Sequence, residues 1–273
     1  MLLEHPALFC ISRPVNVLVP YGMSRNRIDG VTFHTARKHP PSRGFLKASA
    51  EVFYACPEYC FLQMAGVLSL PELVELGYEL CGTYVRDARS GGRTVYGVKP
   101  ATAPTRLASF LRANRGYRGS APARRALQYV SEGSNSPMES ILAMMLCLPM
   151  SLGGYGLPRP VLNGKVTVRM PEIGAAARYC DLYWPDLHLA FEYDSDEFHP
   201  AGRKWQIDSA RRVELGMVEV EVVSVGRMQI EDAKELEKLA RLLCNRAGLR
   251  TERGRFEDSL KRVELHRALM PWI

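Results

Sequence analysis

The sequence contains no long apolar run and no recognisable export signal. A helix that crosses a bilayer needs about 20 consecutive apolar residues, and no stretch of this chain approaches that length. The N-terminus, MLLEHPALFC, lacks the basic start and extended apolar segment of a signal peptide. Internal repeats and low-complexity tracts are also missing. We therefore expect a cytoplasmic globular protein with no membrane partner.

Paired cysteine motifs are absent as well. The chain has seven cysteines, an odd number, and only Cys56 and Cys60 are close together in the sequence. Without paired C-x-x-C motifs, the spacing indicates neither a structural zinc site nor a disulfide framework. We interpret the cysteines as reduced, mostly buried thiols, as is usual in the cytoplasm.

Acidic residues are missing from one stretch that is rich in arginine. Residues 106–125 contain six arginines and no acid. Residues 1–150 carry 17 basic and 10 acidic side chains and residues 151–273 carry 19 of each, so the net charge of +7 belongs to the first part. Such a cluster suits a polyanion such as nucleic acid, with Arg112, Arg115 and Arg118 as candidate contacts. The alternative is a solvated helical face.

What the sequence does contain is an ordinary globular composition. Its 273 residues are 47% hydrophobic and 24% charged, which is enough for one large domain or two smaller ones. In the first part, period-two alternation and proline-led apolar segments predict short strands followed by helices. The expected elements are strands near 15–19, 31–33 and 51–55, a loop at 36–46, helices at 57–66 and 69–81, a connection at 88–104 and an arginine-rich helical segment at 106–125.

The second part shows a clearer order of elements. The polar run EGSNS at residues 132–136 is the best candidate for a domain boundary. The expected elements beyond it are a helix at 136–148, a glycine-rich loop at 151–156, strands at 165–169, 179–184 and 187–193, a helix at 202–215, a strand at 218–225 and helices at 231–247 and 255–269. This order predicts an α/β domain.

The densest chemistry lies in YCDLYWPDLHLAFEYDSDEFH, residues 179–199. Pro185 and Asp186 supply a turn between two strands. If this hairpin is symmetric about Asp186 and Leu187, Asp181 lies opposite Glu192, with their Cβ atoms about 4.5–5.5 Å apart. Two carboxylates at that separation repel each other unless a cation lies between them or one holds a proton.

This arrangement of acids resembles the PD-(D/E)XK nucleases, and most closely the Vsr-like branch that contains very-short-patch-repair endonucleases. The matching residues are Glu139, Asp181 before Trp184-Pro185, Glu192-Tyr193-Asp194, His199, Asp208 and Arg211. The resemblance covers about half of the chain and implies a restriction-endonuclease-like αβββαβ core over residues 133–273. The chain departs from the family where Ser195 replaces a frequent glycine and Asp194 stands at the usual lysine position.

The first part also resembles a known family. The segments RPVNVLVPYGMSRNRIDGVTFHTAR, CPEYCFLQMAG and LPELVELGYEL are similar to the middle of AbiEi-type antitoxin-like proteins, which are often fused to such nuclease domains. This resemblance implies a smaller α+β domain over residues 1–132 that ends in the arginine-rich helical segment. It brings no catalytic motif.

The nuclease resemblance implies a metal-dependent reaction. Phosphodiester cleavage requires an activated water and stabilisation of negative charge on the phosphate, both of which Mg²⁺ or Mn²⁺ can supply. Mg²⁺ prefers oxygen ligands, so Asp181, Glu192 and the Tyr193 carbonyl are the expected ligands. The alternative is that both acids form ion pairs with Arg203 or Arg211.

Three further acid–base candidates each have a structural alternative. Glu139 is either a catalytic acid or only the second half of a capping box that begins at Ser136. His199 is either a general base or acid, or a structural histidine. Asp194 is either the hydrogen-bond acceptor that orients His199, or a cap of the turn with Ser195.

Two basic residues on the following helix are candidate phosphate contacts. Lys204 and Arg211 would supply the cation that Asp194 cannot, whereas the alternative is ordinary helical pairing with Asp208. We therefore expect a Mg²⁺-dependent DNA endonuclease or nickase. The competing hypothesis is a catalytically inactive, antitoxin-like DNA-binding or regulatory protein on a nuclease fold. The sequence leaves the oligomeric state open, a homodimer included.

Overall fold

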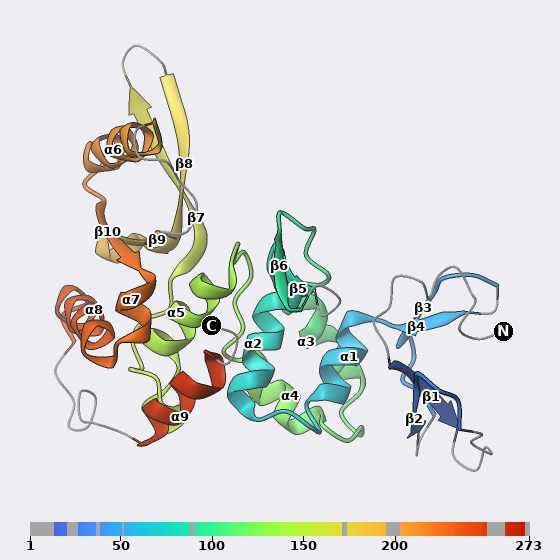
Figure 1. Ribbon diagram of the computed structural model, residues 1–273. Helices are drawn as coiled ribbons and strands as arrows, with labels where there is room; N and C mark the ends of the chain where they lie inside the picture. The colour runs from blue at the N-terminus through green and yellow to red at the C-terminus, as the bar shows by residue number, and fades with distance from the viewer. Residues whose placement is uncertain are drawn as a thin grey trace.

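The computed structural model has a mixed α/β fold with several helices and four separate sheets (Figure 1). It describes residues 14–20, 27–36, 39–50, 52–87, 91–170, 174–194, 203–249 and 260–270. Within these ranges, no helix combines the length and the apolar character needed to cross a membrane.

The first part of the chain consists of three two-stranded sheets and four helices. Its elements are β1 (Val15–Pro20), β2 (Val31–Ala36), β3 (Phe45–Lys47), β4 (Phe53–Ala55), α1 (Pro57–Met64), α2 (Leu70–Cys81), β5 (Tyr84–Asp87), β6 (Arg93–Tyr96), α3 (Pro104–Ala113) and α4 (Ser120–Leu127). Strands β1 and β2 pair in parallel, whereas β3–β4 and β5–β6 are antiparallel pairs. The predicted strands and helices of this part are therefore confirmed, although β1 and β2 are longer than predicted and β4, α1 and α2 are shorter.

Two segments that were expected to be irregular contain strands. The loop predicted at 36–46 is confirmed for residues 39–44, but its end forms β3, where the Phe45 ring packs edge-on against Tyr59 of α1 with centroids 5.5 Å apart. The connection predicted at 88–104 contains β6, which pairs with β5. Gly91 and Gly92 both adopt positive φ next to β6, which is the role of glycine in a hairpin turn. The arginine-rich segment is split into α3 and α4, and Gly119 (φ 86°) caps α4.

The second part contains one four-stranded sheet and the helices around it. Its elements are α5 (Pro137–Cys147), η4 (Met150–Leu152), β7 (Val161–Met170), β8 (Gly174–Trp184), η5 (Pro185–Leu187), β9 (Leu189–Asp194), α6 (Arg203–Gly216), β10 (Glu221–Gly226), α7 (Arg227–Glu231), α8 (Ala233–Arg246) and α9 (Leu260–Leu269). The order of helix, three strands, helix, strand and helix is the order expected from the sequence. Residues 255–259 of the last predicted helix lie outside the described residues.

The helix predicted at 231–247 corresponds to α8, and the short α7 precedes it. Asp232 separates the two helices, because its side chain accepts hydrogen bonds from the backbone N–H groups of Lys234 and Glu235 and so caps the start of α8. The preceding strand starts later than predicted, at Glu221, because Val218 to Val220 form a turn in which Glu219 has a φ of 60°. The C-terminal end of α8 matches the prediction, with Gly248 at a φ of 62°.

The sheet has the order β10-β9-β8-β7, with antiparallel β7–β8–β9 and a parallel β9–β10 pair. A parallel pair needs a crossover connection, which α6 provides. In Figure 1 the long β7–β8 hairpin extends past the short β9, with α6 beside its far end. Leu189 and Phe191 of β9 pack into the larger core cluster with α5 and α8, whereas Ala190 joins a smaller cluster with Leu215 of α6.

The larger core cluster runs through both parts of the chain. It contains Phe61 and Leu73 from α1 and α2, Leu142 from α5 and Leu243 from α8, all fully buried. The predicted boundary at 132–136 is therefore crossed by a continuous core, and Ser134 within it is completely buried. How far the two parts act as separate domains stays a prediction.

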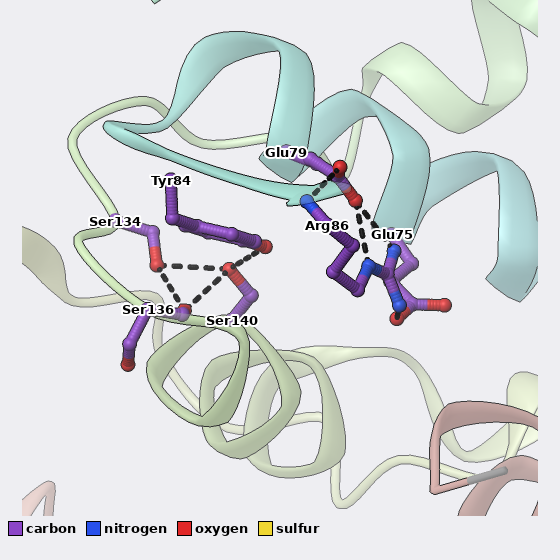
Figure 2. A network of polar contacts seen from close by, with 7 residues as sticks. All are labelled: Glu75, Glu79, Tyr84, Arg86, Ser134, Ser136 and Ser140. Carbon is purple, nitrogen blue, oxygen red and sulfur yellow. Dashed lines mark hydrogen bonds and ion pairs between the residues drawn. The ribbon is translucent and has the colours of Figure 1, made fainter. Parts of the chain in front are cut away.

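Polar contacts also join the two parts (Figure 2). The Tyr84 hydroxyl at the start of β5 lies 2.9 Å from the Ser140 hydroxyl of α5, which in turn lies 2.8 Å from the Ser134 hydroxyl. Beside these hydroxyl groups, the Arg86 guanidinium donates to Glu75 at 2.6 Å and to Glu79 at 2.7 Å, both on α2. We call Glu75, Glu79 and Arg86 the ion-pair network. Together these bonds fix β5 between α2 and α5.

Candidate functional site

Three acids from three different elements meet where the ladder between the two inner strands of the four-stranded sheet ends. Glu139 comes from the first turn of α5, Asp181 from β8 and Glu192 from β9. Their proximity is evident in their electrostatics, because the charge of Asp181 acts on both glutamates and that of Glu192 acts on Glu139. We call Glu139, Asp181 and Glu192 the acid cluster.

The hairpin register explains why two of these acids are neighbours. Leu182 pairs with Phe191 and Trp184 pairs with Leu189, which is the register expected from symmetry about Asp186 and Leu187. The β8–β9 ladder ends at Leu182, so Asp181 and Glu192 do not form a ladder pair, although Glu192 still pairs with Ser224 of β10. The Tyr193 backbone N–H instead donates to the Asp181 carboxylate at 2.9 Å, and the Asp181 backbone N–H hydrogen-bonds the Glu192 side chain.

The neighbouring strand is also irregular at this point. The pairing of β7 with β8 includes Leu162–Leu182 and Gly164–Cys180 but skips Asn163 and Asp181, and Asn163 has a positive φ of 48°. Residues two apart on a regular strand share a face. Here Leu182 belongs to the larger core cluster and Cys180 to the smaller one, so the strand changes face at Asp181.

Glu139 is held by the start of α5. Ser136 is the N-cap, and its hydroxyl accepts the Glu139 backbone N–H at 3.2 Å. The Glu139 carboxylate accepts the backbone N–H of Asn135 at 2.8 Å, one residue before the N-cap. The predicted capping box is therefore half right, because the glutamate bonds the preceding residue. The side chain is only 5% exposed and lies near Asp181, which a box at a helix surface does not require.

Burial raises the pKa values of all three acids, and repulsion by Asp181 adds to this effect at both glutamates. Burial and then the Asp181 charge raise the pKa of Glu139 to about 7, against the hydrogen bonds from Asn135 and Ser136. Burial and then Asp181 raise the pKa of Glu192 to about 7. Burial also raises the pKa of Asp181, although the Tyr193 N–H and Arg211 oppose it. Near neutral pH the acid cluster therefore retains a proton or requires a cation.

Arg211 of α6 provides part of that positive charge. Its guanidinium donates to the Glu192 carboxylate at 2.9 Å and also to the carbonyl of Tyr179. The predicted alternative of an ion pair with Arg211 is thus confirmed for Glu192. One guanidinium against three carboxylates leaves the group negative when all three are ionised.

Sequence reasoning missed three residues at this position. Cys180 is fully buried and hydrogen-bonds Glu192, Asn135 binds the Glu139 carboxylate, and Asn163 interrupts β7 opposite Asp181. The position of Cys180 next to Asp181 was the one available signal. The other two depend on backbone geometry, which residue type does not determine.

The donor set suits a hard divalent cation. Among the described residues, no group of three or more His, Cys, Asp or Glu side chains is arranged to hold a metal ion. Mg²⁺ is commonly held by only one or two carboxylates, with water and substrate phosphate completing the shell. Asp181 and Glu192 provide two carboxylates linked by backbone hydrogen bonds, and burial raises the pKa of both.

The remaining residues predicted for this site are only partly described. Asp194 is exposed at the end of β9, where its backbone lies opposite Gly226 of β10. His199, its predicted partner, lies outside the described residues, as does Ser195. Lys204 and Asp208 lie on α6, but their side chains are not described. The proposed Asp194–His199 pair stays a prediction.

The arginine cluster lies on other elements. Arg112 lies in the last turn of α3, and Arg115 and Arg118 follow in the connection to α4. All three side chains are exposed, and within the described part of the chain none forms an ion pair. These helices pack with α1 and α2, so the arginines are not part of the acid cluster.

Comparison with known proteins adds nothing to this geometry. No family model matches the chain, and no curated protein or solved structure matches it.

Proposed function

We propose that this protein is a Mg²⁺-dependent endonuclease or nickase that hydrolyses phosphodiester bonds in DNA. The acid cluster is the observation that carries the proposal. One buried and two half-buried carboxylates converge from α5, β8 and β9, and two of them have a pKa of about 7. Accumulated negative charge of this kind is more typical of a cation site than of a structural core, where charges are paired.

The chain's own residues have separate roles in this proposal. Asp181, Glu192 and the Tyr193 carbonyl would hold Mg²⁺ or Mn²⁺, which when bound activates water and stabilises charge on the phosphate. The Tyr193 N–H and the Asp181 N–H fix the two carboxylates relative to each other. Glu139 would take up a proton near the attacking water, while Arg211 would turn from Glu192 to the phosphate.

The expected partner follows from charge. Arg112, Arg115 and Arg118 are exposed and lie in the half of the chain that carries the net charge of +7. Three guanidinium groups without acidic partners in the described structure suit a phosphate backbone, whose binding releases counterions. The restriction-endonuclease-like core and the AbiEi-like first part implied by the sequence are consistent with such a partner.

The direct test is cleavage of supercoiled plasmid. Wild-type protein with Mg²⁺ or Mn²⁺ should convert the plasmid to nicked or linear DNA, and EDTA should stop the reaction. A Glu237→Gln variant, altered on the surface of α8, is the matched control and should cleave normally. Plasmid that stays supercoiled with either metal, at protein concentrations that bind DNA, would exclude the nuclease.

DNA binding is tested separately from cleavage. Replacing Arg112, Arg115 and Arg118 by glutamine should weaken duplex binding and flatten the plot of log K against log salt. Each lost phosphate contact lowers the slope by about 0.9. The slope should not change in an Arg169→Gln control, which removes an exposed arginine of β7. An unchanged slope in the triple variant would make this segment a solvated surface.

One observation favours a second function, that of a non-catalytic DNA-binding regulator. Arg211 already pairs with Glu192 at 2.9 Å, and such an ion pair could be the resting state of a site that holds no metal. This protein would bind DNA with the same affinity in EDTA and in Mg²⁺, and calorimetry would detect no Mn²⁺ binding. Saturable Mn²⁺ binding that is lost in an Asp181→Asn, Glu192→Gln double variant would exclude it.

A further inference from the structure

A pocket of about 360 Å³ lies between α5, the segment after η4, α7–α8 and α9. Its floor is apolar, formed by Met145, Leu236 and Leu265, each of which is at most 3% exposed. The volume falls within the range of about 300–1,000 Å³ that is typical of small-molecule sites. Among the described residues, the lining includes no member of the acid cluster.

The wall of the pocket is fixed by close packing. Gly153 lies so near α9 that a Cβ at this position would approach the Lys261 carbonyl oxygen to 2.2 Å. The adjoining Tyr155 is 1% exposed, and the Arg262 guanidinium carbon lies 4.1 Å from the centre of its ring. The pocket therefore has one aromatic wall with a cation held against it.

The charges around the pocket are mainly positive. Arg262 and Arg267 of α9 line it, beside His266, whose ring nitrogen lies 3.2 Å from the Ile230 carbonyl oxygen. The one acid among the described lining residues, Glu231, is engaged by the Arg227 guanidinium at 2.6 Å. An apolar floor with cations at one wall matches a ligand that has an apolar body and a negatively charged end.

We infer that this pocket binds a small amphipathic anion, with an aromatic body and one sulfonate, carboxylate or phosphate group. The body would occupy the space above Met145, Leu236 and Leu265, and the anion would face Arg262. This site is separate from the proposed nuclease function, although both involve α5. That helix carries Glu139 in its first turn and Met145 six residues later.

The pair of probes that tests this assignment differs mainly in charge. The anion 8-anilinonaphthalene-1-sulfonate should bind the full chain saturably with a rise in fluorescence. The uncharged N-phenyl-1-naphthylamine should bind more weakly. Equal affinity for the two probes would overturn the anionic assignment, and fluorescence that rises without saturation would overturn the site.

Two variants locate the binding. Arg262→Met keeps the apolar stem and should weaken the sulfonate about three- to fivefold, as expected for a partly exposed charge contact, with little effect on the uncharged probe. Val263→Trp should block the mouth and weaken both probes, because Val263 lines the pocket yet is 48% exposed and tolerates a larger side chain.

The matched control is Arg125→Met, which removes an exposed arginine of α4 and should change neither affinity. Near-UV circular dichroism reports whether each variant keeps its tertiary packing. If a well-folded Val263→Trp protein binds both probes like wild type, this pocket is not the binding site. If Val263→Trp loses its packing, the Arg262→Met result decides alone, and an unchanged sulfonate affinity overturns the proposal.

Discussion

The molecule contains two groups of largely buried acids, each with an arginine of its own. The two groups differ in how completely the negative charge of the acids is paired. In the ion-pair network, Arg86 donates to Glu75 and to Glu79, and its backbone N–H donates to the second oxygen of Glu79 at 2.9 Å. In the acid cluster, Arg211 binds only Glu192 among the three acids. The first group is a nearly closed set of bonds, whereas the second retains uncompensated negative charge.

The comparison shows that the number of acids does not identify a functional site. Burial alone would lower the pKa of Arg86, but Glu75 and Glu79 raise it, so the charged arginine is stabilised. Burial still raises the pKa of Glu75, although Arg86 opposes the shift. Burial and repulsion raise the pKa of Glu139 and Glu192 to about 7, so their charged forms are destabilised. A strained charge state of this kind persists only where structure or function maintains it.

The sharpest way to separate the two groups is to neutralise one acid in each. Asp181→Asn or Glu192→Gln should reduce plasmid cleavage at least about 10³-fold, equal to about 4 kcal/mol of transition-state stabilisation. Each should also raise the melting temperature of the metal-free protein at pH 8, because like-charge repulsion is removed.

The matched variant in the ion-pair network is Glu79→Gln. It should lower the melting temperature and leave the cleavage rate of the folded protein unchanged, because among the described residues the Glu79 carboxylate is hydrogen-bonded only to Arg86. The contrast between the two groups fails if Glu192→Gln cleaves like wild type or if Glu79→Gln stabilises the protein.

Removing the arginine of the ion-pair network should lower the free energy of unfolding. This loss should be smaller than the loss of transition-state stabilisation expected when an acid of the acid cluster is neutralised. Arg86→Met leaves Glu75 and Glu79 without their cation, and breaking a buried pair in this way costs about 3 kcal/mol. The Arg86 side chain is 20% exposed, so the lower end of the usual range applies. Urea denaturation followed by circular dichroism measures the change. A loss below about 1 kcal/mol would mean that solvent screens the pair.

The acid cluster should make the stability of the metal-free protein depend on pH. The pKa values of Glu139 and Glu192 are about 7 in the folded protein and 4.5 ordinarily, so the folded state binds protons more tightly between these values. Stability from this source is complete below about pH 4.5 and is lost as the pH rises through about 7. Thermal melting in EDTA across this range measures the loss.

Divalent metal supplies the control for this pH dependence. Mn²⁺ should raise the melting temperature more at pH 8 than at pH 5, because a cation stabilises the ionised carboxylates. A Glu139→Gln, Glu192→Gln double variant should melt with much less dependence on pH over the same interval. Stability that rises with pH in the wild type would mean that other groups dominate the linkage.

Much of the architecture around the acid cluster could be predicted from local sequence. Period-two alternation and Pro185-Asp186 determine both the hairpin and its register, because a slip by one residue would move Phe191 out of the core. The segments with weak patterns were the ones missed. β3 and β6 have three and four residues, and their pairing depends on partners that periodicity does not reveal.

The candidate site was only partly predictable for a related reason. Asp181 and Glu192 follow from the hairpin register, and the pairing of Arg211 with Glu192 was foreseen as an alternative. The contact of Asn135 with Glu139 and the positive φ of Asn163 opposite Asp181 arise from backbone geometry, which many residue types can adopt. Cys180 reaches Glu192 only because β8 changes face beside it.

Two helix N-termini with the same Ser-x-x-Glu sequence allow the comparison to be made at a single glutamate in each. Both Ser69-Leu-Pro-Glu72 and Ser136-Pro-Met-Glu139 start helices with a serine followed three residues later by a glutamate. Glu72 accepts the Ser69 backbone N–H at 2.8 Å, and its hydrogen bonds with Ser69 lower its pKa. Burial and Asp181 raise the pKa of Glu139, so the same motif has opposite electrostatics at the two positions.

Replacing each glutamate by glutamine should therefore change stability in opposite directions at pH 8. Glu72→Gln should lower the free energy of unfolding by a few tenths of a kcal/mol, because a charge near a helix N-terminus is lost. Glu139→Gln should raise it by about 1 kcal/mol, because the amide can still accept the Asn135 N–H without repelling Asp181. At pH 5, where Glu139 is protonated, the gain should disappear. Urea denaturation at both pH values measures this. If Glu139→Gln is destabilising at both, Glu139 acts as a helix cap and its place in the acid cluster has no electrostatic consequence.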